Sequence, residues 1–384
     1  MVLSTKRHSP WIAIVTAYPP DVGRLSEYAK ELVKAMSEKI NEKILILSDR
    51  SQPGDEKLII KDSWRPDSIL GMIKLWLNVV TVKCRLMHFN LHLAVFGSSK
   101  IVNFLGLISP LLARLSGKKV VITLHNIPDT INLEEAKLKN SLLNRIGLTI
   151  AMKILAASAR TIIVKVRSYV KILRTRYSAK NVKFIPHGAW FAKHPGVWRA
   201  DRRENILFIG YIAPYKDLKR LAEIIARLRL KVPKLKLLIS GSLHPNYSKE
   251  GEEILREILN KPFVIYLGRV PNNLIPRLTS ISRALILPYR TSTGTSGVYH
   301  LVAGLGLPVI APPTLEFREL VREGAGIMLV DLWSDEAEEK LLRLLRDDSL
   351  AIKLSRKNIE YAMKRSWDEI AQEYLKVFHE ALTK

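Results

Sequence analysis

Residues 284–312 read ALILPYRTSTGTSGVYHLVAGLGLPVIAP, and this stretch decides the fold. The apolar run at 284–288 is typical of a buried strand, and a loop of small hydroxyl and glycine residues follows at 291–297. An apolar helical stretch, closed by Gly304, leads to a second buried run at 308–311. Short apolar runs that alternate with helical stretches predict a parallel sheet.

The loop at 291–297 stands where such a sheet binds ligands, outside the carboxyl ends of its strands. The loop also opens a helix, where free backbone N–H groups and the helix dipole favour an anion, most often a phosphate. An ordinary turn is the alternative, because serine and glycine are common in turns. The loop is neither a Walker A loop nor a GxGxxG fingerprint.

Length and composition limit the class of protein. The chain has 384 residues and is 47% hydrophobic, enough for about two domains with real cores. A net charge of +25 predicts an anionic partner: nucleic acid, acidic lipid or a phosphorylated substrate. The single cysteine, Cys84, excludes an internal disulfide framework, fits a reducing compartment and is expected to be structural.

Targeting signals are not found in the sequence. No signal peptide is visible, and no run reaches the roughly 18 to 20 apolar residues needed to span a bilayer. We therefore expect a cytoplasmic protein. Glutamine occurs only as Gln52 and Gln372, which favours a thermophilic source.

The first half of the chain alternates strands and helices. A strand at 11–17, a loop with Gly23 and Arg24, and an amphipathic helix at 26–37 repeat the geometry of a ligand-facing loop, with a plain βα turn as the alternative. His125 and Asn126 follow a buried strand at 120–124, at the edge where ligands bind. Further strands are expected at 43–47, 85–91, 160–164 and 182–186, and further helices at 68–82, 100–116 and 142–157.

The second half restarts after a polar, basic linker at 190–204. The strand at 205–209 is followed by Gly210, Tyr211 and Lys216, and Asp217 is a good N-cap for the next helix. The next strand ends in Ser240 and Gly241. Further strands are expected at 235–239 and 263–267, and further helices at 249–259, 274–281, 334–345, 350–364 and 367–382.

Six stretches, taken together and in order, resemble the glycosyltransferases of family four in an archaeal-like form. They read YPPDVGRLSEYAKEL, TLHNI, FIPHG, FIGYIAPYKDLKRLAEII, LPYRTSTGTSGVYHLVAGLGLPVIAP and SWDEIAQEYLKVF. The resemblance implies a GT-B fold of the α/β class, with two doubly wound Rossmann-like domains facing a central cleft. Residues 1–190 would bind the acceptor and residues 200–365 the nucleotide-sugar, and the helix at 366–384 would pack back on the first domain.

The activity that the resemblance implies is transfer of a hexose from a nucleotide-diphosphate sugar, with retention of anomeric configuration. It implies no cofactor and no obligatory metal, and the chain has no Asp-x-Asp motif. The acceptor would be lipid-linked, phosphorylated or a saccharide. Basic residues beside the apolar helical stretches of the first half predict peripheral binding to the anionic inner face of a membrane.

The resemblance also assigns roles to single residues. His125 and Lys216 would be catalytic, the second by binding the departing diphosphate as its charge grows. The acceptor would contact Gly23, Arg24, His125 and Asn126. The donor would contact Gly210, Tyr211, Lys216, Ser240, Gly241, Thr295, Ser296, Gly297 and Val298.

Three positions depart from the family pattern. The family's paired glutamates in the donor loop are Thr293 and Leu301 here, and its arginine after the first glycine is Tyr211. These departures keep open a second reading, a GT-B partner subunit that has lost catalysis. A nucleic-acid-binding protein is a third reading, which the charge alone supports, since no helix-turn-helix, zinc pattern or stacking-aromatic motif is present.

Overall fold

The computed structural model describes residues 10–20, 25–50, 53–54, 56–131, 141–190, 198–201, 204–291 and 294–383. These residues form two compact units, each built on one sheet. The first unit takes its described residues from Met1–Asp129, Leu138–Pro186 and Trp367–Lys384, and the second from Thr130–Lys137 and His187–Ser366. Both sheets are parallel throughout, as predicted.

The first sheet has seven strands in the order β3-β2-β1-β4-β5-β6-β7. The chain moves outward from β1 through β2 to β3, then returns to start β4 on the other side of β1. This reversal makes the β1/β4 boundary the topological switch point, beside which doubly wound proteins bind ligands. The strands are β1 (Ile12–Val15), β2 (Ile44–Ser48), β3 (Leu58–Asp62), β4 (Leu86–Leu91), β5 (Lys119–Leu124), β6 (Thr161–Val164) and β7 (Val182–Phe184).

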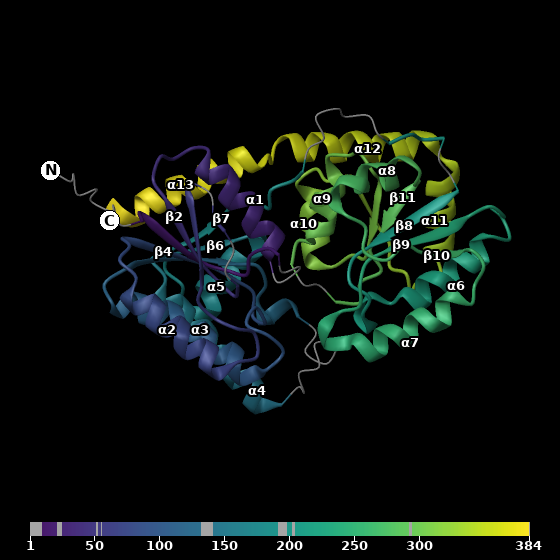
Figure 1. Cartoon of the computed structure of the whole chain (residues 1–384). Coiled ribbons are helices and arrows are strands. Elements are labelled where there is room, and N and C mark those ends of the chain that lie inside the picture. The colour runs from purple at the N-terminus through teal and green to yellow at the C-terminus, as the bar shows by residue number, and fades with distance from the viewer. Residues whose placement is uncertain are drawn as a thin grey trace. The chain divides into compact units, whose positions relative to one another are not determined.

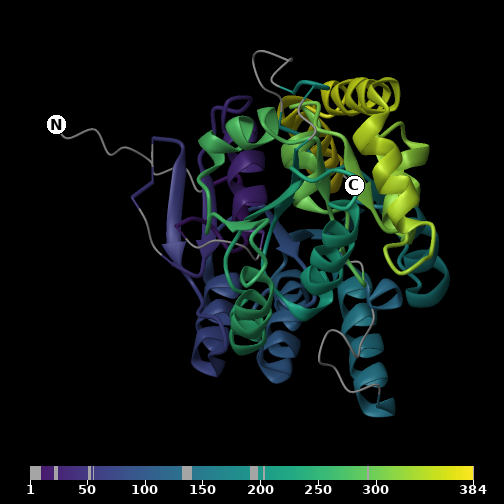
Figure 2. The ribbon, with the colours of Figure 1, turned by 90° about the vertical axis from the view of Figure 1, so that its right-hand side faces the viewer.

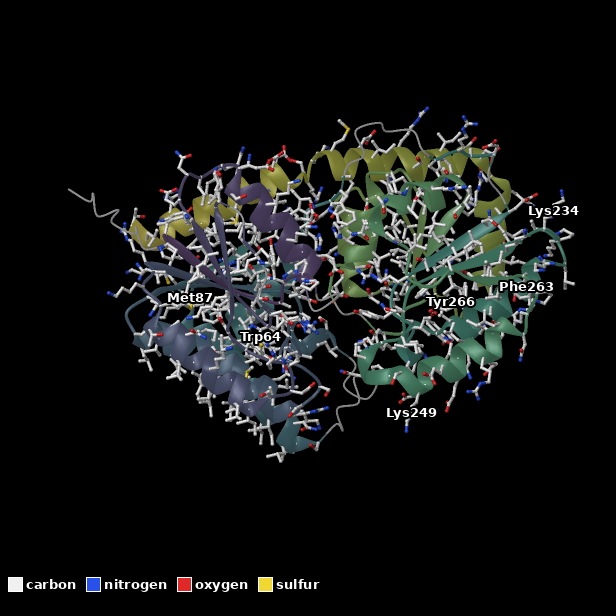
Figure 3. The ribbon with its side chains drawn as sticks, in the orientation of Figure 1. Trp64, Met87, Lys234, Lys249, Phe263 and Tyr266 are labelled. Carbon is white, nitrogen blue, oxygen red and sulfur yellow. The ribbon has the colours of Figure 1, made fainter. Side chains whose placement is uncertain are left out.

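Helices cover both faces of this sheet (Figure 1). Ala13 and Val15 of β1 face the core under α2, α3, α4 and α5, which also contains Trp64 and Met87 (Figure 3), whereas Ile14 faces the core under α1 and α13. Because both faces are buried, the strands read as unbroken apolar runs. The helices are α1 (Ser26–Ser37), α2 (Ile69–Thr81), α3 (Lys100–Leu115), α4 (Leu142–Ser158), α5 (Arg167–Tyr177) and α13 (Trp367–Thr383).

The second sheet repeats this plan with six strands in the order β10-β9-β8-β11-β12-β13. Its switch point is therefore the β8/β11 boundary. The strands are β8 (Asn205–Ile209), β9 (Lys236–Ser240), β10 (Val264–Tyr266), β11 (Ala284–Ile286), β12 (Val309–Ala311) and β13 (Ile327–Leu329). The helices are α6 (Leu218–Leu228), α7 (Ser248–Leu259), α8 (Ile275–Ser280), α9 (Gly297–Ala303), α10 (Leu315–Arg322), α11 (Ala337–Arg346) and α12 (Asp348–Met363). The order of the two sheets confirms the predicted fold class.

Two elements of the first unit were not expected from the sequence. The strand β3 lies at the sheet edge, and its apolar residues are partly in solvent, as the 43% exposure of Ile59 illustrates. The helix α5 is rich in arginine, but it buries Tyr169, Leu173 and Tyr177 at a spacing of four residues. That spacing was the available signal for a helix.

Candidate functional site

Lys216 lies at the switch point of the second sheet, in the loop between β8 and α6. The side chain is 7% exposed. Its Nζ lies 3.1 Å from the centroid of the Tyr289 ring, which follows β11, and 5.1 Å from that of Tyr215. Two segments more than seventy residues apart in sequence thus meet around one ammonium group.

The charge of Lys216 is not neutralised within the described residues, since none of their carboxylates pairs with it. Burial lowers the pKa of Lys216 well below its ordinary value. An ammonium over aromatic rings keeps part of its stabilisation through the ring electrons. A bound anion would supply the stabilisation that the ammonium loses on burial, so the position is suited to a phosphate.

Asp217, the next residue, directs its carboxylate elsewhere. Its Oδ1 accepts from the backbone N–H of Arg220, which makes it the predicted N-cap of α6, at a φ of 35°. Its Oδ2 accepts from Trp333 Nε1 at 3.2 Å and lies 3.7 Å from Arg290 Nε. The neighbouring acid therefore leaves Lys216 free to meet an anion.

Tyrosine hydroxyls gather near this lysine. Burial raises the pKa of Tyr289 to about 12, and a side-chain hydrogen bond with Ser296 opposes this shift in part. Burial also raises the pKa of Tyr215, and the nearby Tyr289, Tyr247 and Tyr211 add to it. Tyr215 and Tyr289 therefore remain protonated at neutral pH, and the hydroxyl of Tyr215 can donate a hydrogen bond to a phosphate oxygen. Tyr211 thus offers a hydroxyl where the family pattern has an arginine.

The predicted donor residues Ser296 and Gly297 lie at the start of α9. Ser296 caps α9 through its Oγ, which accepts from Tyr299 N at 3.4 Å, and has a φ of 56°, a region that non-glycine residues rarely adopt. A Cβ at Gly297 would meet nothing within 4 Å, so its backbone is open to close approach. Thr295 is buried and Val298 half-buried. Thr293 lies outside the described residues.

Gly210 and Gly241 bring the ends of β8 and β9 together. Gly210 has a φ of 139°, and a Cβ on Gly241 would lie 1.8 Å from the Gly210 carbonyl oxygen. The N–H of Gly241 donates to Gly268 O at 2.8 Å, and Ser240 Oγ accepts from Val270 N at 3.4 Å. The N–H of Gly241 and the hydroxyl of Ser240 already have hydrogen-bond partners. We therefore expect these residues to shape the donor site through close packing of the backbone.

His125 lies in the first unit, one residue past β5 and 7% exposed. Its Nε2 bonds Asn90 Oδ1 at 2.8 Å, and Asn90 Nδ2 donates to Thr16 Oγ1 at 3.1 Å. Since a carbonyl oxygen only accepts, Nε2 is the donor in this hydrogen bond. The group thus sits near the carboxyl ends of β1, β4 and β5, next to the first switch point.

The other predicted acceptor residues divide into two groups. Asn126 is buried, and its Oδ1 accepts from Leu93 N at 3.0 Å, which ties the loop after β4 to the end of β5. Gly23 and Arg24 lie outside the described residues, so their role stays a prediction.

Lys165 was not singled out from the sequence, although it follows β6 at the same edge as His125. It is 3% exposed, and its Nζ donates to the hydroxyl of Tyr374 in α13 at 2.7 Å. A lysine directly after a buried strand was the only signal for it.

The remaining residues that could bind a metal or act as a nucleophile are His88 and Cys84. No group of three or more His, Cys, Asp or Glu side chains that could hold an ion occurs within the part of the chain that the structure describes. His88 bonds Thr123 Oγ1 at 2.8 Å, and burial, helped by the charge of Lys165, lowers its pKa to about 3. Burial raises the pKa of Cys84 to about 11, which makes it a poor nucleophile.

Solved structures with the same architecture include several glycosyltransferases. The sucrose-phosphate synthase of Thermosynechococcus elongatus superposes with a TM-score of 0.76 at 16% identity, over 98% of this chain and 99% of that one. HepE of Anabaena, in complex with UDP-glucose, gives 0.68 at 15% identity, over 96% and 99%. WaaG, a glycosyltransferase involved in lipopolysaccharide biosynthesis, gives 0.66 at 11% identity, over 96% and 99%.

These similarities establish the GT-B fold: two Rossmann-like units, each with a topological switch point in its sheet. Residues 203–347 match the family described as Glycosyl transferases group 1. No curated protein matches the chain by sequence. The match lies within the second unit and confirms the resemblance of this unit to group 1 glycosyltransferases. The archaeal-like character stays a prediction.

Proposed function

We propose that this protein transfers a sugar from a nucleotide-diphosphate sugar to an acceptor, with retention of anomeric configuration. The observation that carries the proposal is the buried ammonium of Lys216 at the second switch point, with no carboxylate partner among the described residues. The diphosphate of the donor would supply the missing charge. As the sugar leaves, charge builds on that diphosphate, so a fixed cation there stabilises the transition state more than the ground state.

The other donor contacts follow from the same edge of the second unit. Tyr211 and Tyr215 can donate hydroxyl hydrogen bonds to phosphate oxygens, and the open backbone at Gly297 permits close approach. Uridine is the first nucleotide base to test, because the structure of HepE is a complex with UDP-glucose. Thermal shift and calorimetry of the full chain with UDP, ADP and GDP would test donor binding. No response to any of the three would refute it.

The proposed acceptor edge is that of the first unit, at His125. His125, whose Nε2 bonds Asn90 Oδ1, is the residue proposed to contact the acceptor hydroxyl. The stereochemical part of the proposal rests on the family resemblance. Proton NMR of the freshly formed product would test it, since an inverted anomer would contradict retention.

An anionic membrane surface is the proposed partner of the first unit. The helices α2 and α4 each pack against α3 (Figures 1 and 2). Several of their large apolar side chains stay exposed. Leu70 and Leu77 of α2 are 77% and 62% exposed, and Leu142 and Leu143 of α4 are 75% and 79% exposed. We take these exposed leucines as the candidate interaction site of the first unit.

The charge on the same helices fits a membrane rather than a second protein core. Lys100 of α3 and Lys153 of α4 are exposed, and a cation near an anionic surface contributes about 1 kcal/mol. Among the described helices, none combines the length and the apolarity needed to cross a bilayer. The proposal is therefore reversible peripheral binding, with a lipid-linked or phosphorylated acceptor delivered to the first unit.

A nucleotide-binding subunit without catalysis is the second candidate. Leu301, at the position of a family glutamate, packs against the core of the second unit and offers no ribose contact. Assays of donor hydrolysis and of sugar transfer separate the two candidates. A non-catalytic subunit would bind the nucleotide but would catalyse neither reaction.

A further inference from the structure

A second buried lysine, Lys165, lies in the first unit and has no part in the donor site. It follows β6 at the carboxyl edge of the sheet, where β4 and β5 also end. Its Nζ donates to Tyr374 at 2.7 Å and lies 4.9 Å and 4.7 Å from the ring centroids of Tyr28 and Tyr374. The ammonium is thus held between two aromatic side chains from α1 and α13.

The hydrogen-bonding capacity of Lys165 is only partly used. An ammonium has three N–H donors, and one of them meets Tyr374. Within the residues that the structure describes, no carboxylate pairs with Lys165 and no other acceptor takes its remaining N–H groups. A buried ammonium without an anion is strongly unfavourable, and burial accordingly lowers the pKa of Lys165 well below its ordinary value.

Holding α13 in place does not require this charge. The hydroxyl of Tyr374 also bonds Tyr28 at 3.0 Å and Thr123 Oγ1 at 2.8 Å. Those two neutral hydroxyl partners would remain if the lysine were replaced by an apolar side chain of similar length. A buried ammonium is therefore a poor choice for a purely structural contact at this place.

Lys165 and Lys216 share one arrangement. Both follow a strand at the carboxyl edge of their sheet, both are more than nine-tenths buried against tyrosine rings, and neither has a carboxylate partner among the described residues. In the first unit, the Tyr28 ring contacts Lys165 on one side and the His125 ring edge-on at 4.6 Å. The cation therefore lies next to the proposed acceptor edge.

We propose that Lys165 binds a phosphate group carried by the acceptor, beside His125. The term acceptor rests on the proposed function, whereas the phosphate site itself does not. The phosphate would belong to a phosphorylated sugar or to a lipid head group, which present the same oxyanion. Its arrival would favour the charged amine, so binding takes up a proton and strengthens as the pH falls through the depressed pKa of Lys165.

Calorimetry with the full chain tests this proposal. The probes are glucose 6-phosphate and a short-chain phosphatidic acid below its micelle concentration, each in two buffers of different ionisation enthalpy. All proteins carry Lys216→Met, which removes the buried ammonium of the proposed donor site and leaves Lys165 as the site under test. At least one probe should bind with proton uptake, and the probe that binds identifies the source of the phosphate.

Substitution of Lys165 gives the decisive comparison. Lys165→Met should weaken binding about 10- to 100-fold, the size of a charge-assisted phosphate contact, and abolish the proton uptake. Lys165→Arg should keep most of the affinity, because it restores a cation. Lys171→Met, at an exposed position of α5, is the matched control and should bind like its parent.

Three results would overturn the proposal. These are no binding of either probe, equal binding by Lys165→Met, or a melting temperature of Lys165→Met several degrees below its parent, which would mark a structural lysine. Failure of this inference can be told apart from failure of the proposed function. If phosphate binding needs Lys165 but the protein transfers no sugar, only the proposed sugar transfer is refuted. Sugar transfer with Lys165-independent phosphate binding would refute this inference alone.

Discussion

The Nζ of Lys216 lies 3.1 Å from the centroid of the Tyr289 ring, and no carboxylate among the described residues pairs with it. The lysine and the ring come from the loops that follow β8 and β11, the two strands that border the switch point. Such a pair holds a cation in place without neutralising it, because the aromatic ring carries no net charge. The ammonium is thereby prepared for a ligand anion before that ligand arrives.

Replacement of this ammonium should impair donor use. We expect Lys216→Ala to lower kcat/KM for the nucleotide-sugar by one to three orders of magnitude, since a charge-assisted phosphate contact is worth roughly 1.5–3 kcal/mol and strengthens in the transition state. Lys219→Ala, which removes a half-buried lysine of α6 paired with Glu257, is the matched control and should be near wild type. Full activity of Lys216→Ala would exclude the assignment.

The ring beneath the lysine gives a second test. Tyr289→Phe keeps the aromatic face and should change nucleotide affinity less than about threefold, whereas Tyr289→Leu should weaken it about 5- to 30-fold, in line with a desolvated cation–π contact of up to roughly 2 kcal/mol. Calorimetry with UDP measures both. Equal losses in the two variants would show that the hydroxyl or the packing matters and not the ring face.

Metal removal should leave sugar transfer intact. The described residues hold no cluster of His, Cys, Asp or Glu suited to an ion, and lysine can take the role that a cation plays elsewhere. Initial rates measured with and without EDTA should agree within about twofold. Loss of activity with EDTA and recovery with Mg²⁺ or Mn²⁺ would contradict this expectation.

Membrane binding should depend on both charge and the outer apolar face of the first unit. We expect co-sedimentation with vesicles that contain anionic lipid, weakened as salt rises and the Debye length falls to about 3 Å near 1 M. The double variant Leu77→Asn/Leu143→Asn should bind more weakly. Leu230→Asn, at an 85% exposed leucine of the second unit, should bind normally. Equal binding to neutral vesicles would assign the charge to another purpose.

Much of the fold was predictable because its signals are local. The apolar runs of β8 and β11 and the capping residue Asp217 each act within a few residues of the chain. The edge strand β3 was missed because two of its five residues are exposed and two are half-buried, and its sequence therefore lacks the unbroken apolar run of a central strand. The helix α5 was missed because its arginines mask a narrow apolar stripe.

The sequence by itself determined the order of the elements, the two parallel sheets and the position of Lys216 after a strand, since hydrophobic period and caps are written into neighbouring residues. Only the tertiary structure decided which lysines lack an anion. Lys165 meets Tyr374 across 209 residues of sequence, and Lys216 meets Tyr289 from another strand. Burial and charge pairing are properties of neighbours in space, so no local pattern separates these two cations from the many lysines in solvent.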